Sequence, residues 1–200
     1  MNFTMHHFVL SPTLQSSELA PFGELVRNCQ LWWASKGVYL ECPPIELVRT
    51  HPIDVTGDNP WNQALSWWLG RPEYTVDGLA VVLLHGWDSQ LYIGWGGRPL
   101  ALVGDYAIKR LLSRPTTPDD PTDAADGAAI VDDWVAGELL LHEEGHALGL
   151  SHDFTTPGAV MNYSQHQGFN SVLGPVSAQE LERVWTPRAH TRTQACVRPA

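Results

Sequence analysis

The segment 142–152 holds residues whose types and spacing fit metal-dependent hydrolysis. His142 and His146 are four residues apart, so on a helix they lie on one face with Cβ atoms about 6 Å apart. That separation lets two imidazole nitrogens reach one zinc ion at about 2.0–2.1 Å. Glu143 lies one step around the helix, where it can take a proton from a metal-activated water. We therefore expect His142 and His146 to bind zinc and Glu143 to be catalytic.

A turn after this helix supplies the third ligand. Gly149 follows the last helical turn, where a residue without Cβ can take a positive φ and reverse the chain. The reversal brings His152 back toward the first two histidines. Three protein ligands leave the fourth zinc position open, as a catalytic zinc requires. The alternative is a pair of ordinary histidines on a helix, but all five fixed positions of H-E-x-x-H-x-x-G-x-x-H are present.

Together with Ala159-Val160-Met161-Asn162-Tyr163, this segment resembles the zinc site of the metzincin metallopeptidases. The resemblance makes Met161 the floor of the site, packed under the imidazoles without binding the metal. It gives Tyr163 a catalytic role at the metal or at the transition state; an ordinary half-buried tyrosine is the alternative. The short gap from His152 to Met161 is matrixin-like. A tyrosine two residues after the methionine is instead typical of astacins, serralysins and pappalysins.

The resemblance implies a zinc-dependent endopeptidase with one catalytic Zn²⁺, a protein or peptide substrate and Glu143 as general base. We expect a monomer. Two alternatives stay open: a zinc-binding protein that has lost catalysis, and a cytoplasmic metallohydrolase acting on a non-peptide amide. Secretion is expected from the family, but the first seven residues have no basic or long apolar region and do not read as a signal peptide, so a cytoplasmic location stays open.

Charge is unevenly distributed along the 200 residues. The chain has 12 basic and 22 acidic residues and a formal net charge of −10. Twelve acids and no lysine or arginine lie in 115–182, so this segment carries −12 and the rest of the chain +2. Such a field repels phosphate backbones, which excludes nucleic acid as a partner, and it favours basic side chains near the scissile bond. The longest apolar run, 79–84, is too short to cross a membrane.

Hydrophobic periodicity and turn residues place the elements around the motif. We expect helices over 16–36 (ended by Gly37), 60–69 and 131–148, and a further helix that begins at Ser177 with Glu180 as its capping partner. We expect strands over 38–40, 45–48, 79–84, 90–94 and 100–103. The strand 79–84 is apolar throughout, so we expect burial on both faces. The segment 90–100 is our candidate for an edge strand that pairs with an extended substrate, with an ordinary hairpin as the alternative.

These elements, read with the resemblance, predict an α+β fold of the two-lobe zincin kind. It would contain a twisted, mostly parallel sheet with one antiparallel edge strand, a backing helix, the active-site helix and a small C-terminal lobe with a terminal helix. The whole chain, 1–200, would be one catalytic domain. Its N-terminal lobe would cover about 1–149 and its C-terminal lobe about 150–200.

Several further residues have less decisive patterns. Asp123, Asp126 and Gly127 lie in a Pro/Asp/Thr-rich loop that faintly resembles a calcium loop, although the spacing fails the EF-hand pattern; a solvated loop is the alternative to Ca²⁺. His6 and His7, near the start of the chain, are expected to be solvated, and His85, at the end of a strand, to be structural. The cysteines Cys29, Cys42 and Cys196 allow one disulfide plus a thiol, or three thiols.

Overall fold

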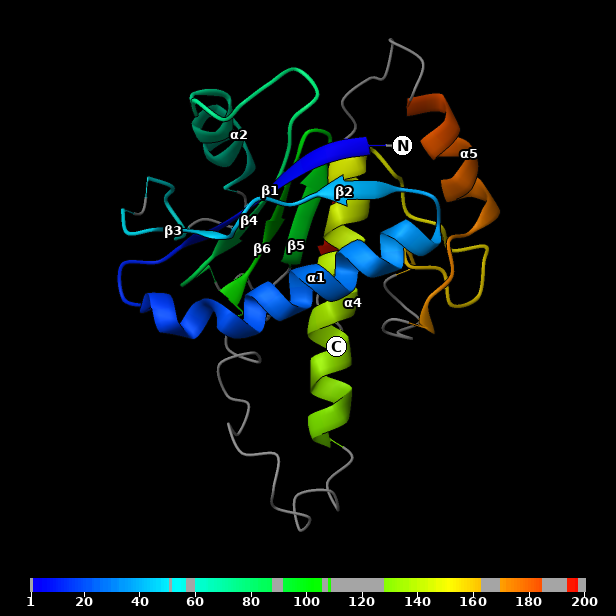
Figure 1. The fold of residues 1–200 in the computed structure, drawn as a ribbon, viewed down its shortest axis with the longest axis horizontal. Helices are drawn as coiled ribbons and strands as arrows, with labels where there is room; N and C mark the ends of the chain where they lie inside the picture. The colour runs from blue at the N-terminus through cyan, green and yellow to red at the C-terminus, as the bar shows by residue number, and fades with distance from the viewer. Residues whose placement is uncertain are drawn as a thin grey trace.

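A seven-stranded sheet with helices on both faces forms the centre of the molecule (Figure 1). The computed structural model describes residues 2–50, 52–56, 60–87, 92–105, 108, 128–162, 170–184 and 194–197. The strands are β1 (Asn2–Leu10), β2 (Tyr39–Glu41), β3 (Glu46–Val48), β4 (Leu79–Leu84), β5 (Tyr92–Gly97), β6 (Leu100–Val103) and β7 (Gln194–Val197). The helices are the 3₁₀ turn η1 (Ser16–Leu19), α1 (Ala20–Ser35), α2 (Trp61–Leu69), α4 (Ala128–Leu148) and α5 (Pro175–Val184).

The sheet is mostly parallel. Its strands follow the order β2-β1-β4-β6-β5-β7, and β3 also pairs with β1. All pairings among β1, β2, β3, β4 and β6 are parallel, whereas β5 runs antiparallel to β6, and β7 runs antiparallel to β5. Only β5 therefore runs against the other strands, because β7 is parallel to β6, so the sheet has the one antiparallel strand that was expected. The prediction that 90–100 forms the edge is wrong, because β5 has a neighbour on each side.

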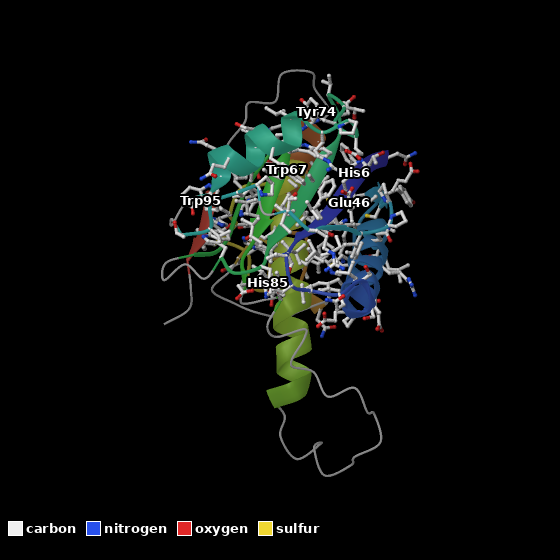
Figure 2. The ribbon with its side chains drawn as sticks, turned by 90° about the vertical axis from the view of Figure 1, so that its left-hand side faces the viewer. His6, Glu46, Trp67, Tyr74, His85 and Trp95 are labelled. Atoms are coloured by element: carbon white, nitrogen blue, oxygen red, sulfur yellow. The ribbon has the colours of Figure 1, made fainter. Side chains whose placement is uncertain are left out.

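Two hydrophobic clusters cover the two faces of the sheet. In β4, Leu79, Val81 and Leu83 pack with α1 and α4 on one face. The alternate residues of β4 pack on the other face with Trp61 and Trp68 of α2, the side that faces the viewer in Figure 2. The predicted burial of this strand on both faces is thus confirmed. A strand with no exposed face loses the apolar–polar alternation that marks ordinary surface strands.

Strand β1 was not expected from the sequence. It lies in the middle of the sheet, paired over six residues with β4, although two histidines interrupt its apolar pattern. His7 is 1% exposed, so the expectation that it is solvated is wrong. His6 is half-buried and its ring lies 5.4 Å from that of Trp68.

The remaining helices lie close to their predicted bounds, with one difference at α5. This helix begins at Pro175, and the Ala178 N–H donates to the Gly174 carbonyl at 2.9 Å. Proline is preorganised for a first helical turn. Ser177 therefore lies inside the helix, and the expected capping box is wrong. Glu180 instead accepts a hydrogen bond from the Ser151 N–H at 2.8 Å.

The described part of the chain contains no helix that is both long and apolar enough to cross a membrane. Within the same part, Cys29 and Cys42 are thiols rather than a disulfide. The proposed calcium loop, with Asp123, Asp126 and Gly127, lies outside the described residues. The last strand, β7, comes from beyond residue 149 and joins the sheet built by the first part of the chain.

Candidate metal centre

The three histidines of the motif converge at the C-terminal end of α4. One nitrogen from each of His142, His146 and His152 lies within 4.8 Å of the others. The Nε2 atoms of His146 and His152 are 3.1 Å apart. Two nitrogens bound at about 2.05 Å to one tetrahedral zinc would lie about 3.3 Å apart, so the spacing fits that metal.

Backbone carbonyls orient two of these imidazoles. The Nδ1 atom of His142 lies 2.7 Å from the Val160 carbonyl oxygen, and that of His146 lies 2.8 Å from the Leu150 carbonyl oxygen. A carbonyl only accepts hydrogen bonds, so both Nδ1 atoms carry the proton. The lone pair is left on Nε2, the nitrogen that would bind a metal. Such partners fix the ring and its tautomer at metal sites.

Burial favours the neutral form of His146 and His152. It lowers the pKa of His146 well below its usual value, with further lowering from the neighbouring His142 and His152. Burial also lowers the pKa of His152 to about 4. Metal ligands must be deprotonated, so these imidazoles are ready to bind a cation at neutral pH.

Helix α4 ends in a Schellman motif, and this turn positions His152 near the other two histidines. The Gly149 N–H donates to the His146 carbonyl, and the Leu150 N–H donates to the Gly145 carbonyl, both at 2.9 Å. This pattern requires a left-handed residue after the helix, and Gly149 has φ +98°. The positive φ expected at this glycine is confirmed.

Met161 packs against α4, the helix that carries His142 and His146. Its side chain is fully buried, and a Cβ added to Gly145 would lie 2.4 Å from the Met161 sulfur, so the thioether packs directly on the helix backbone. A turn positions it, because the Asn162 N–H donates to the Ala159 carbonyl at 2.8 Å. The Asp153 N–H donates to the Met161 carbonyl at 3.0 Å, which ties this turn to the residue after His152.

Strand β5 closes the other side of the site. A Cβ on Gly94 would lie 2.0 Å from the Glu143 carboxylate, and a Cβ on Gly96 would lie 2.2 Å from the His146 Cβ. Glycine at both positions lets the strand backbone approach α4 this closely. Glu143 is fully buried between the helix and this strand. Residue 94 therefore contacts the predicted general base, and residue 96 contacts a predicted ligand.

A second buried glutamate, Glu144, has partners that sequence reasoning missed. Its carboxylate accepts a hydrogen bond from Trp33 Nε1 at 2.7 Å and lies 3.0 Å from His7 Nε2. All three residues are at most 1% exposed. The contact joins α4 to both β1 and α1. The only available signal was the alternation of Met5, His7 and Val9, which gives one strand face a polar residue among apolar ones.

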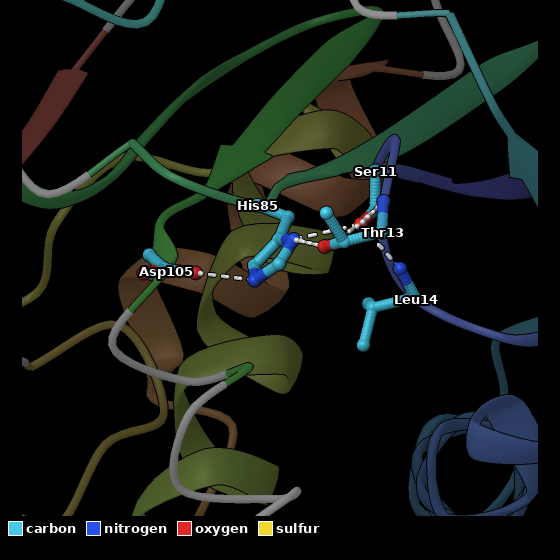
Figure 3. Close-up of polar contacts among 5 residues, drawn as sticks. All are labelled: Ser11, Thr13, Leu14, His85 and Asp105. Atoms are coloured by element: carbon cyan, nitrogen blue, oxygen red, sulfur yellow. Dashed lines mark hydrogen bonds and ion pairs between the residues drawn. The ribbon is translucent and has the colours of Figure 1, made fainter.

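A separate polar cluster lies at the carboxyl ends of β1 and β4 (Figure 3). Ser11 Oγ is 2.7 Å from His85 Nδ1, and His85 Nε2 is 3.7 Å from an Asp105 carboxylate oxygen. The order serine, histidine, acid is that of hydrolase triads. Ser11, however, is fully buried, and its oxygen accepts hydrogen bonds from the Thr13 and Leu14 N–H groups. This cluster closes the turn after β1, so the structural role expected for His85 agrees with its contacts.

Tyr163 lies outside the described residues, so its predicted catalytic role stays a prediction. The residues that the structure brings together are the three histidines, Glu143 and Met161.

Comparisons with known proteins bear on the fold. The sequence matches no protein-family model and no curated protein sequence. Among solved structures, an archaemetzincin from Methanopyrus kandleri aligns over 92% of this chain and 95% of its own, with 13% identity and a TM-score of 0.56. This chain therefore shares its fold with that archaemetzincin.

Two further solved structures are less similar. An archaemetzincin from Archaeoglobus fulgidus aligns over 91% of this chain and 99% of its own, with 14% identity and a TM-score of 0.43. A zinc-dependent peptidase from Methanocorpusculum labreanum aligns over 89% and 92%, with 13% identity and a TM-score of 0.43. These likenesses are too loose to support a conclusion.

Proposed function

We propose that this chain is a zinc-dependent endopeptidase of the metzincin type. The main support for this proposal is that His142, His146 and His152 converge near the buried carboxylate of Glu143. Three converging imidazoles, two of them oriented by backbone carbonyls, form a donor set that suits zinc and leaves a coordination position for chemistry. The fold shared with an archaemetzincin supports the same assignment.

Zinc bound by these histidines would act as a Lewis acid on the scissile carbonyl and lower the pKa of the attacking water. Glu143 would then act as the general base, taking a proton from the attacking water and delivering it to the leaving amine. The contact with Gly94 holds its carboxylate beside β5. Met161 supports the helix from below, and Tyr163 is the proposed donor to the developing oxyanion.

The proposed substrate is an extended peptide, with basic side chains preferred because 115–182 carries twelve acids and no basic residue. We further propose that the protein acts as a monomer with two lobes, about 1–149 and about 150–200, the second of which contributes β7 to the sheet of the first.

The decisive change is Glu143→Ala. We expect the wild-type chain to bind about one zinc ion and to cleave peptides from a proteome digest, and a chelator to stop cleavage. The variant should keep its zinc but lose about 10²–10⁴-fold in turnover, because general-base catalysis contributes that much. Metal content by mass spectrometry and cleavage products by peptide mass spectrometry measure the two effects.

Glu182→Ala is the matched control, since it removes an exposed carboxylate from α5. It should leave both metal content and turnover unchanged. Near wild-type turnover in Glu143→Ala would overturn the general-base assignment. A wild-type chain that binds zinc but cleaves no peptide would favour the non-catalytic alternative, and cleavage of small amides alone would favour the non-peptide hydrolase.

A further inference from the structure

Strand β5 is covered along both of its edges. On one side it pairs with β6, from Gly94 opposite Val103 to Gly97 opposite Leu100. On the other side it pairs antiparallel with β7, the last strand in the sheet order. The edge that could receive an extended peptide is therefore occupied by a segment of the same chain.

The register places β7 beside the residues that touch the metal centre. Cys196 is the partner of Gly94, which contacts the Glu143 carboxylate, and Gln194 is the partner of Gly96, which contacts His146. Neighbouring strands lie about 4.8 Å apart, so β7 lies one strand spacing from the strand that lines the site. An added peptide strand on this edge of β5 would need the same main-chain donors and acceptors.

Strand addition depends on main-chain hydrogen bonds, which any extended segment can make. Whether β7 or a free peptide occupies the edge of β5 then depends on their local concentrations. Only nine residues, 185–193, join α5 to β7. A short tether of this kind gives an effective concentration in the millimolar range, far above that of a free peptide.

The sequence around β7 is opposite in charge to the acidic segment 115–182. The ten residues from 191 to 200 include Arg192 and Arg198 and no acid, whereas 115–182 carries −12. Opposite charges of this kind attract over short distances. The segment thus has the composition that we propose for a substrate.

We propose that β7 is an intramolecular competitor of the substrate, and that it must leave β5 before an extended peptide can pair there. The inference rests on the proposed function and adds regulation to the same site. The short length of β7 allows release, because a four-residue edge strand has few hydrogen bonds to break.

The first test compares three zinc-loaded proteins: the full chain, a chain ending at residue 193, and a control ending at residue 197, which keeps β7. Loss of a competitor lowers KM and leaves kcat unchanged. We expect the chain ending at 193 to have a KM about tenfold lower or more, and the control to match the full chain. Equal KM values for the full chain and the chain ending at 193 would overturn the proposal.

The second test does not depend on peptidase activity. A fluorescent synthetic peptide of residues 191–200 is titrated into the metal-free proteins, and its anisotropy is measured. It should bind the chain ending at 193 and fail to bind the full chain. Binding to both equally, or to neither, would overturn the proposal. If no protein cleaves any peptide, this titration still decides whether β7 occupies the edge of β5, so the two proposals fail separately.

Full-length variants guard against misfolding of the shortened chain. Successive residues of a strand direct their N–H groups to opposite edges, so only one of Gln194 and Ala195 donates toward β5. Proline removes that donor. We expect one of Gln194→Pro and Ala195→Pro to lower KM and the other to serve as its control. The same KM in both variants and in the wild-type chain would count against the competitor.

Discussion

Glu143 and Glu144 are consecutive glutamates that lie in different surroundings. Glu143 packs against Gly94 on the side of β5, next to the predicted zinc ligands. Glu144 points toward β1 and α1, where Trp33 and His7 contact its two carboxylate oxygens. A buried carboxylate is costly unless its oxygens are hydrogen-bonded, and both oxygens of Glu144 have partners. Glu144 therefore connects α4 to β1 of the sheet and to α1.

The substitution Glu144→Gln tests this contact. An amide keeps the shape of the side chain but removes its charge and one acceptor oxygen. Either Trp33 loses its acceptor, or His7 must move its proton to Nδ1 so that Nε2 can accept from the amide. We expect the free energy of unfolding of the metal-free protein to fall by about 1–3 kcal/mol, the cost of leaving a buried polar group without a partner. Urea unfolding followed by circular dichroism measures the change.

Glu182→Gln, an exposed change on α5, is the control and should alter stability by less than about 0.5 kcal/mol. Trp33→Phe should also cost less in the Glu144→Gln background than in the wild type, because the two residues share one hydrogen bond. Additive costs would contradict the pairing.

At the scale of the elements, α1 and α4 end in the same way. Each has a glycine with positive φ after its last turn, Gly37 at +79° and Gly149 at +98°. The residue after each glycine donates a backbone hydrogen bond to the helix. The Val38 N–H donates to the Trp33 carbonyl, and the Leu150 N–H donates to the Gly145 carbonyl. The two ends differ in the segment to which they lead, because α1 leads to β2 and α4 leads to the third histidine. Substitutions at Gly37 and Gly149 can therefore distinguish the loss of stability caused by a strained turn from the effect of that turn on zinc binding.

We predict that Gly149→Ala and Gly37→Ala both destabilise the fold by about 1–2 kcal/mol, because a Cβ disfavours positive φ. Only Gly149→Ala should also weaken zinc binding, since it displaces His152 from the other two ligands. Isothermal titration with zinc after chelator treatment measures the affinity. Equal zinc affinities in the two variants would show that the turn does not position the ligand.

For the whole molecule, the buried histidines link the stability of the metal-free protein to pH. The pKa of His152 is about 4 in the folded chain and about 6.5 when unfolded, and the pKa of His146 is lowered too. Between these values the unfolded chain binds protons that the folded chain does not. The free energy of unfolding should therefore fall as pH falls from about 6.5 toward 4.

This loss should be smaller in His152→Asn, which removes one of the titrating groups. Thermal unfolding of both metal-free proteins across this pH range provides the comparison, and the carboxylates common to both cancel in the difference. If the melting temperatures of the wild type and the variant changed with pH in the same way, the contribution assigned to His152 would be contradicted. Zinc should raise the melting temperature of the wild type at neutral pH and lose this effect in acid, because protons compete for the same nitrogens.

The sequence by itself determined the cluster of three histidines. His142, His146 and His152 lie within eleven residues, so helix geometry and one glycine turn decide where they meet. Strand β4 was predictable for a related reason, because an unbroken apolar run reports burial on both faces. In each case the signal is local, carried by residues close together in the chain.

Only the tertiary structure decided which distant segments flank that cluster. His7 and Trp33 are 137 and 111 residues from the glutamate that they contact, and β7 pairs with a strand about one hundred residues earlier. No local period encodes such a pairing, because strand neighbours are chosen by the packing of the whole sheet. The three converging histidines could thus be named from spacing alone, whereas the contacts of Glu144 and the strand occupying the edge of β5 required the fold.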